Sequence, residues 1–275
     1  MEYSSCNEFE VNKMGPFNKL IKEIIVQSET YLVYMDHDGT IQWATIGINM
    51  PDGAGEIINK VSDWEFKVNS LFAKTEAYNI KTILAEGYAR LFADQSIILA
   101  RDVVDRAIET ITVKGSDILK QYYAFSATLF TILSALGILL TKLNKSLVID
   151  TFGRDEYNIW LTMLFGGIGA YVFTTIRARD YKANIIIGKW VHALDGALRI
   201  FYGVIAGLIV SIAIKSNLAL GFFNRADKGI YVMLFVGICA GASDLFIPNI
   251  IRQIERKSSV TENKTPVKSK TIGTK

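Results

Sequence analysis

The sequence predicts an α-helical membrane protein, in which four transmembrane helices follow a small α-rich cytosolic domain with one β-hairpin. Half of the 275 residues are apolar and the mean hydropathy is +0.26, and this excess lies almost wholly after residue 121. Charge divides at the same point. Residues 1–121 carry 12 Lys and Arg against 18 Asp and Glu, whereas residues 122–275 carry 18 against 9. An acidic soluble part therefore precedes a basic, apolar one.

This composition excludes several classes of function. An acidic soluble part disfavours nucleic acid as a partner, because phosphate binding depends on clustered Lys and Arg. Cys6 and Cys239 lie in unrelated environments and predict no disulfide, which fits a reducing cytoplasm. His37 and His192 lack metal-ligand spacing, so we expect no metal and no cofactor. The first 30 residues contain no apolar run typical of a secretory signal.

Within the soluble part, residues 1–15 are expected to be a flexible N-terminus and 16–121 the folded domain. The apolar spacing of residues 16–27 predicts a short amphipathic helix. Two β-prone runs joined through Asp38-Gly39 predict a hairpin over 31–48. Three helical stripes follow, the last ending where Gly115-Ser116 interrupts its pattern.

Four apolar segments then predict a transmembrane domain over 122–251, because a helix needs roughly 17–25 residues to cross the hydrocarbon layer. The expected spans are about 122–141, 159–176, 200–223 and 230–251. The third is long enough only if Lys215 extends towards the lipid headgroups. The tail 252–275 is basic, without apolar periodicity, and is expected to be disordered.

Lys and Arg predict the orientation. The loop Arg177–Arg199 holds five of them and the tail from Arg252 seven, whereas Lys142–Asn158 and Lys215–Gly229 hold three each. This favours a bacterial inner-membrane protein with both termini cytoplasmic, although Lys142 and Lys145 oppose the trend. Residues 185–198 fit either a helix on the inner membrane surface or the extension of a span, and the sequence leaves both open.

Small residues recur at four-residue spacing in three of the spans, which permits close helix packing. Such packing serves either one bundle or a homo-oligomer. Asp244 and Lys215 form a candidate intramembrane polar site, with an interfacial ion pair or snorkelling as the ordinary alternatives. Asp195 and Arg199, four residues apart, are a candidate pair at the inner interface. The candidate packing residues are Gly166, Ala170, Gly203, Gly207, Gly237 and Gly241.

Residues 31–40 end in Asp-His-Asp-Gly-Thr, which resembles the first motif of haloacid-dehalogenase-like phosphatases. That resemblance implies Asp36 as nucleophile and Asp38 as general acid and base. The later motifs of the family and the sequence for its parallel sheet are missing, and a hairpin turn explains the same letters. No catalytic residue is therefore assigned.

The last span carries Ala-Gly-Ala-Ser-Asp followed by Pro248 and resembles a set of uncharacterised bacterial four-span proteins. The layout is also similar to membrane effectors of anti-phage defence systems. These resemblances imply a non-enzymatic effector, in which a cytosolic protein or small-molecule trigger acts on the soluble domain and the oligomeric bundle changes membrane permeability. A membrane-anchored scaffold is the alternative, and a transporter is poorly supported because no inverted repeat or broken-helix pair is evident.

Overall fold

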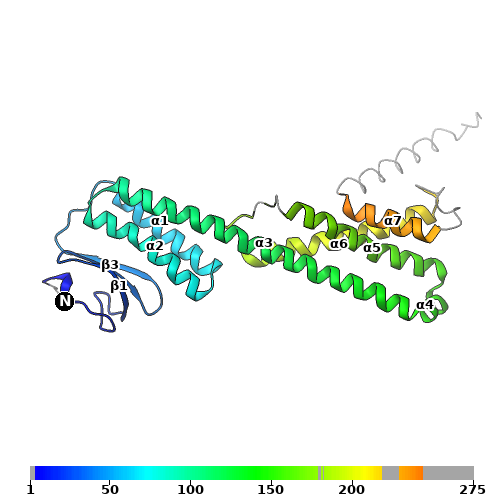
Figure 1. Ribbon diagram of the computed structural model, residues 1–275, viewed down its shortest axis with the longest axis horizontal. Coiled ribbons are helices and arrows are strands. Elements are labelled where there is room, and N and C mark those ends of the chain that lie inside the picture. The colour runs from blue at the N-terminus through cyan, green and yellow to red at the C-terminus, as the bar shows by residue number, and fades with distance from the viewer. Residues whose placement is uncertain (1–3, 179–180, 182, 219–228, 244–275) are drawn as a thin grey trace, which may run out of the picture. The chain divides into compact units, whose positions relative to one another are not determined.

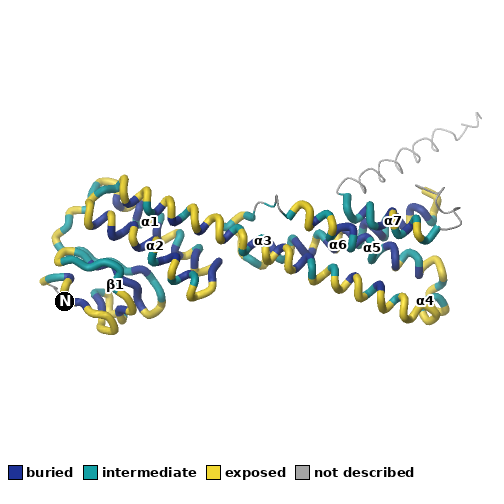
Figure 2. Tube along the Cα trace, viewed as in Figure 1, coloured by how far each residue is buried: buried dark blue, intermediate teal, exposed yellow. Residues whose placement is uncertain are grey.

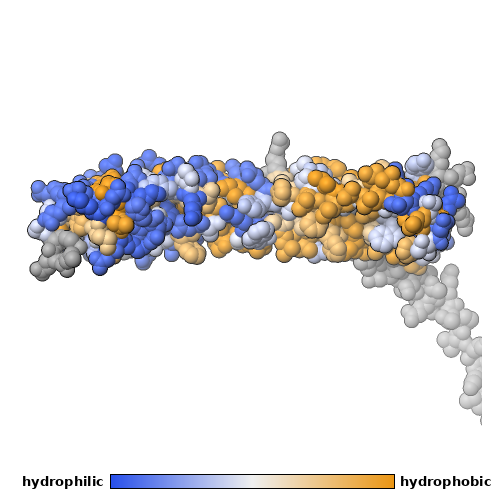
Figure 3. All heavy atoms as spheres, turned by 90° about the horizontal axis from the view of Figure 1, so that it is seen from below, coloured by the Kyte–Doolittle hydropathy of each residue, from blue (hydrophilic) through white to orange (hydrophobic). Residues whose placement is uncertain are grey.

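A computed structural model describes residues 4–178, 181, 183–218 and 229–243 (Figure 1). The chain divides into two compact units. Unit 1 comprises residues 1–119 and 182–189, and unit 2 comprises residues 120–181 and 190–275. Hydrophilic residues dominate the visible surface of unit 1, whereas hydrophobic residues cover most of the visible surface of unit 2 (Figure 3).

Unit 1 contains a three-stranded antiparallel sheet in the order β1 (Ile21–Gln27), β2 (Tyr31–Asp36) and β3 (Ile41–Thr45). The central strand is buried on both faces because its side chains alternate between two cores. Val33 and Met35 face the helices, and Leu32 and Tyr34 face the N-terminal segment. The expected hairpin is therefore part of a larger sheet, and its turn contains Gly39 at a φ of +75°.

The prediction of a helix over 16–27 was wrong. The run Ile24-Ile25-Val26 is rich in β-branched side chains, and pairing with β2 provides backbone hydrogen bonds that no local pattern reveals. The expectation of a flexible segment over 1–15 also needs correction for its described residues. Cys6, in a short 3-10 helix (Cys6–Glu8), is buried with Phe9 against the sheet. Gln27 Nε2 donates to the carbonyl oxygens of both residues, at 2.8 and 3.0 Å.

Helices α1 (Ala54–Leu71), α2 (Lys74–Ala93) and the first part of α3 (Ile97–Leu143) complete unit 1. Their buried positions recur at helical spacing and form one core with the inner face of the sheet (Figure 2). Gly87 allows α2 to approach α3 closely, since a Cβ there would overlap Val104. Burial of this shared apolar surface is the main stabilising contribution to the unit.

The expected interruption at Gly115-Ser116 is absent, because α3 is one helix of 47 residues. A single Gly costs a helix only about 1 kcal/mol, which tertiary packing outweighs. A Cβ at Gly115 would lie 3.3 Å from Leu71 Cδ1 and 3.7 Å from Ile185 Cδ1, so this glycine serves close packing within unit 1. The helix belongs to unit 1 up to Leu119 and to unit 2 from Lys120.

Unit 2 contains the rest of α3 with α4 (Lys145–Phe152), α5 (Arg154–Ala178), α6 (Lys189–Lys215) and α7 (Gly229–Ala242). Within the described residues, α3, α5 and α6 are long and apolar enough to cross a membrane, and α7 is a shorter apolar helix. The first three expected spans thus fall on α3, α5 and α6, but the third has other bounds than expected. α6 gains its length before residue 200, from Lys189, and ends at Lys215, after which residues 216–218 are not helical. For the fourth span, the described helix is α7, of 14 residues. Residues 219–223 and 244–251 lie outside the described residues, as does the tail.

The structure decides between the two alternatives for residues 185–198. From Lys189 onward they belong to α6, so they extend a membrane helix. The preceding residues 183–188 belong to unit 1, where Ala183 and Ile185 pack against the core. The described residues 183–188, which lie between α5 and α6, are therefore part of unit 1.

Candidate functional site

The candidate packing residues of unit 2 lie where α5, α6 and α7 approach one another. A Cβ added at Gly203 would lie 2.7 Å from the carbonyl oxygen of Gly166, and one at Gly207 would lie 2.6 Å from that of Thr162. A Cβ at Gly237 would lie 2.8 Å from the same Thr162 oxygen. Backbones this close leave no room for a larger side chain, so glycine is required by packing.

The remaining candidate packing residues, Gly166, Ala170 and Gly241, lie at the same contact between α5, α6 and α7. A Cβ at Gly241 would overlap the carbonyl group of Gly166, and a Cβ at Gly203 would overlap Ala170 Cβ. Gly166 thus contacts both α6 and α7, at positions that the sequence pattern had singled out. Gly169 makes a further close approach to the backbone of Ile238.

A cavity of about 240 Å³ lies beside this contact. Its wall includes Gly203 and Gly241 and the polar side chains of Thr174, Arg199 and Ser243. Arg199 is the only positively charged residue among the described residues that line this cavity. Asp244 is the residue after Ser243, and it lies outside the described residues.

The structure gives the other predicted polar residues separate environments. Lys215 Nζ, at the end of α6, lies 2.5 Å from Asp155 Oδ1 in the first turn of α5. The ordinary expectation for Lys215 was that its side chain extends to the lipid headgroups. In the structure it instead forms an ion pair with Asp155. Asp195 and Arg199 lie one turn apart on α6, and Arg199 lines the cavity.

An aromatic cluster connects three segments of unit 2. The rings of Tyr123 and Tyr181 stack with centroids 4.4 Å apart, and the Tyr181 hydroxyl lies 2.7 Å from Nδ1 of the buried His192. Burial and the negative charge of Asp195 raise the pKa of Tyr181 to about 12. Gly196 meets the backbone of Tyr123 on the same side of α6. Sequence reasoning missed His192, although it lies four residues before Gly196 on this helix face.

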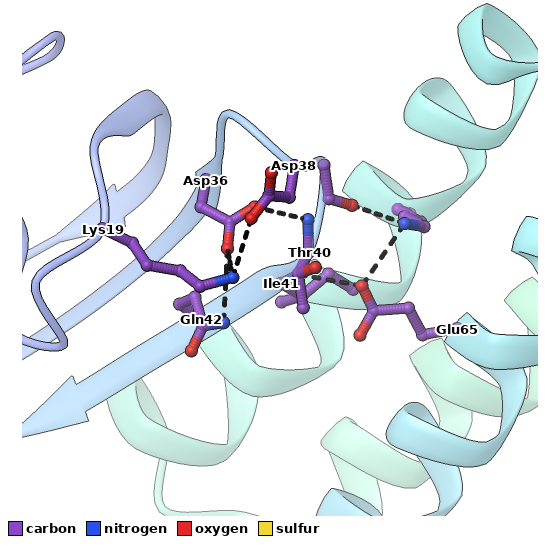
Figure 4. A network of polar contacts seen from close by, with 9 residues as sticks. Lys19, Asp36, Asp38, Thr40, Ile41, Gln42 and Glu65 are labelled. Carbon is purple, nitrogen blue, oxygen red and sulfur yellow. Dashed lines mark hydrogen bonds and ion pairs between the residues drawn. The ribbon is translucent and has the colours of Figure 1, made fainter.

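In unit 1, a polar network surrounds the turn between β2 and β3 (Figure 4). Lys19 Nζ lies 3.0 Å from Asp36 Oδ2 and 2.9 Å from Asp38 Oδ2, while the backbone N–H of Thr40 donates to Asp36 Oδ1 at 2.8 Å. Burial alone would raise the pKa of Asp36, but the hydrogen bonds from Thr40 and Lys19 outweigh it and lower the pKa below its ordinary value. The two carboxylates also raise the pKa of Lys19.

A second part of the network joins the turn to the helices. Glu65 of α1 accepts the backbone N–H of Ile41 at 2.9 Å, and Lys81 of α2 lies 3.4 Å from the same carboxylate oxygen. Lys81 also donates to the carbonyl oxygen of Gly39. Burial raises the pKa of Glu65, although Ile41 and Lys81 oppose the shift. Glu65 and Lys81 each occupy a position on the buried, otherwise mostly apolar face of their helix. A charged residue at such a position is the sequence signal that could have revealed this pair.

This geometry bears on the resemblance to phosphatases. Asp36 and Asp38 converge on one ammonium group, beside an antiparallel sheet. In the phosphatase reading, a magnesium ion would be held by such carboxylates. Across the residues that the structure describes, no three His, Cys, Asp or Glu side chains gather closely enough to hold a metal ion. The network as observed fixes the turn to the helices.

No protein-family model and no solved structure matches this sequence. The human protein solute carrier family 35 member G1 is 29% identical to the chain over 149 residues. This match covers 54% of the chain and 39% of the human protein, so the chain spans well under half of that relative's length. Taken with the apolar helices of unit 2, the similarity shows that this chain is a multi-pass membrane protein.

Proposed function

We propose that this chain is a non-enzymatic membrane effector in which unit 1 receives a cytosolic signal and thereby changes the packing and permeability of unit 2. One observation carries the proposal: the chain passes between the units three times, near residues 119, 181 and 189. A soluble domain that only anchored itself to the membrane would need one connection. Three connections let a change in unit 1 act on α3, α5 and α6 together.

The connections differ in stiffness. α3 is helical without interruption across the boundary at Leu119, and a continuous helix transmits rotation and displacement better than a flexible linker. The second and third connections flank residues 183–188, whose Ile185 packs on the unit 1 core. A ligand that binds one arrangement of that core better than another would shift the population of both arrangements.

In unit 2, the close contact of α5, α6 and α7 is the element that would respond. Backbones that meet through Gly166, Gly203 and Gly241 cannot slide gradually, because each has little free space beside it. Such contacts favour discrete arrangements, and the cavity next to Arg199 lies at the same place. We propose that the signal opens this contact to ions or small solutes.

The coupling can be tested at the helix boundary. Lys120 and Gln121 do not belong to the apolar core of either unit. The double change Lys120→Gly and Gln121→Gly should therefore weaken α3 locally, by about 1 kcal/mol per residue relative to Ala. The matched control is Lys120→Ala with Gln121→Ala. In induced cells, a potential-sensitive dye should report depolarisation for the control and the unmodified chain but a lost or unregulated response for the glycine variant. Equal responses of both variants would contradict transmission through α3.

The permeability itself needs a separate measurement. Purified full-length chain in liposomes should release an entrapped ion or small solute, and Gly203→Leu with Gly207→Leu should change that release while membrane insertion is unaffected. If neither liposomes nor cells ever lose an ion gradient, the effector proposal fails. The scaffold alternative would then remain, with binding partners recovered after cross-linking as its test.

Solute transport is a second candidate function, favoured by the similarity to a human solute carrier over 149 residues. The two candidates predict different behaviour of the helix-boundary variants. A transporter should show saturable uptake that survives Lys120→Gly with Gln121→Gly, because its activity does not depend on a signal from unit 1. An effector should show flux that depends on the intact boundary.

We further propose a cellular setting for the chain. The distribution of Lys and Arg supports a bacterial inner membrane with both termini cytoplasmic, which fluorescence of a C-terminal reporter fusion would test. Exposed apolar side chains on α3, such as Phe125, Leu129 and Leu133, provide a surface for lipid or for a second copy of the chain. Mass measurement in nanodiscs would distinguish a monomer from the proposed homo-oligomer. A role in anti-phage defence rests on layout alone, and survival of phage-challenged cells with and without the gene would test it.

A further inference from the structure

At the end of unit 2 where α3 finishes and α7 begins, four basic side chains from different elements line one cavity. Lys142 lies in the last turn of α3, Lys145 begins α4, Arg154 begins α5 and Lys215 ends α6. The cavity has a volume of about 650 Å³ and is also lined by Tyr157. No acidic side chain among the described residues lines it.

The sequence around these four basic residues does not explain why they gather at one cavity. Lys142 and Lys145 run against the distribution of positive charge that predicts the orientation of the chain. The ordinary explanation is that each long side chain extends separately to the lipid headgroups. Separate snorkelling does not account for side chains from α3, α4, α5 and α6 meeting around one cavity.

Among the described residues, the positive charges at this cavity are only partly compensated. Lys215 is paired with Asp155, whose side chain is 68% exposed. Lys142, Lys145 and Arg154 have no acidic partner within the described part of the chain. Three like charges around one cavity repel each other, and a bound anion would relieve that repulsion.

We propose that this cavity binds a phosphate group, with Lys142, Lys145 and Arg154 as its cationic ligands. Several lysines and a forked guanidinium group match the multiple oxygens and the charge of phosphate better than those of a single carboxylate. The cavity has room for more than the phosphate itself and lies at the ends of apolar helices, where lipid headgroups are found. The phosphate belongs either to such a headgroup or to a soluble phosphate compound. This proposal does not depend on whether the bundle conducts ions.

The test uses the full-length chain in nanodiscs and follows thermal unfolding by tryptophan fluorescence. In one arm, nanodiscs of phosphatidylcholine alone are titrated with inorganic phosphate and with glycerol phosphate. In the other, cardiolipin is added to the phosphatidylcholine and soluble phosphate is left out. Ligand that binds the folded state raises the unfolding temperature.

Lys142→Gln with Lys145→Gln should weaken the apparent affinity at least about tenfold, because each lost contact is a charge-assisted hydrogen bond. The matched control is Lys114→Gln with Lys120→Gln, which removes two charges of α3 away from the cavity and should change the affinity by less than about twofold. Arg154→Gln is a second single variant in case the double variant fails to insert. Replacement of the two lysines by Arg should restore binding.

If only cardiolipin raises the unfolding temperature, and the cavity variant loses this rise, the ligand is a lipid headgroup. If only the soluble phosphates do so, the ligand is a soluble phosphate compound. Either result supports the site. Two results would overturn it: no stabilisation in either arm, or an equal loss of affinity in the cavity variant and the matched control, which would indicate general attraction between a basic surface and anions.

Discussion

Lys81 Nζ of α2 lies 3.4 Å from Glu65 Oε1 of α1, and the exposed fractions of the two side chains are only 4% and 12%. The same carboxylate accepts the backbone N–H of Ile41, and the same ammonium group donates to the carbonyl oxygen of Gly39. This buried ion pair thus joins α1 and α2 to the connection between β2 and β3, through Gly39 in the turn and Ile41 at the start of β3. It fixes the position of the sheet on the helices.

We expect the two partners of this pair to be strongly interdependent. Lys81→Met leaves a buried carboxylate without its counter-charge and should lower the free energy of unfolding by about 3–5 kcal/mol. Glu65→Gln resembles the protonated carboxyl group that burial already favours, so it should cost less than Lys81→Met. The double variant removes both charges and should cost less than Lys81→Met alone. Thermal or chemical unfolding followed by the fluorescence of Trp43 and Trp64 would measure all three. Additive losses would show that the pair is not coupled.

Acid should destabilise unit 1 through Asp36. Its pKa is lowered in the folded state, so the unfolded chain takes up the proton first as the pH falls. The stability that Asp36 contributes is therefore present above its unfolded pKa and is lost below about pH 4. Unfolding measured from pH 6 to about pH 3 should show a decline that is shallower in Asp36→Asn.

Glu65 should act in the opposite direction in this experiment. Its pKa is raised by burial, so the folded state binds its proton more readily and acid adds stability through this group. Glu65→Gln removes that contribution and should steepen the decline below neutral pH. A variant with an unchanged slope would show that the carboxylate titrates normally.

Gly207 should tolerate no side chain at all. A Cβ would lie 2.6 Å from the carbonyl oxygen of Thr162, so Gly207→Ala must force α5 and α6 apart and should cost about 1–3 kcal/mol. Gly55→Ala is the control, because no atom lies within 4 Å of its Cβ position, and it should stabilise α1 by about 0.5–1 kcal/mol. Unfolding in a mild detergent would compare them. Equal effects would mean that close packing does not determine which residue is tolerated.

Asp155 should limit the proposed anion binding by neutralising Lys215. Asp155→Asn removes an exposed partner, so the free energy of unfolding should change by less than about 1 kcal/mol. The freed ammonium group should at the same time increase the affinity for phosphate in the nanodisc titration. A reduced affinity would show that the ion pair orders the cavity and does not compete with the anion.

Some features could be predicted because they depend only on local sequence. A long run of apolar side chains can be accommodated only in lipid or in a core, which is why the segments containing residues 122–141 and 159–176 were recognisable as membrane helices. Gly166, Gly203 and Gly241 were recognisable from their spacing, since residues four apart share one helix face. The spacing could not show which faces meet.

Other features could not be predicted, because their stabilising contacts come from distant parts of the chain. Residues 21–27 have an apolar pattern that fits a helix as well as a strand, and pairing with β2 decided the matter. Gly115 suggested the end of a helix, whereas packing against Leu71 and Ile185 kept the helix continuous.

The sequence by itself determined that an acidic soluble part precedes a bundle of apolar helices, because hydrophobicity and charge are properties of each segment. Only the tertiary structure decided that Ile185 packs in unit 1, that Lys81 pairs with Glu65, and that Lys142, Lys145 and Arg154 surround one cavity. These relationships join residues far apart along the chain. No local periodicity encodes them, and the burial and hydrogen bonding that select them exist only once the chain has folded.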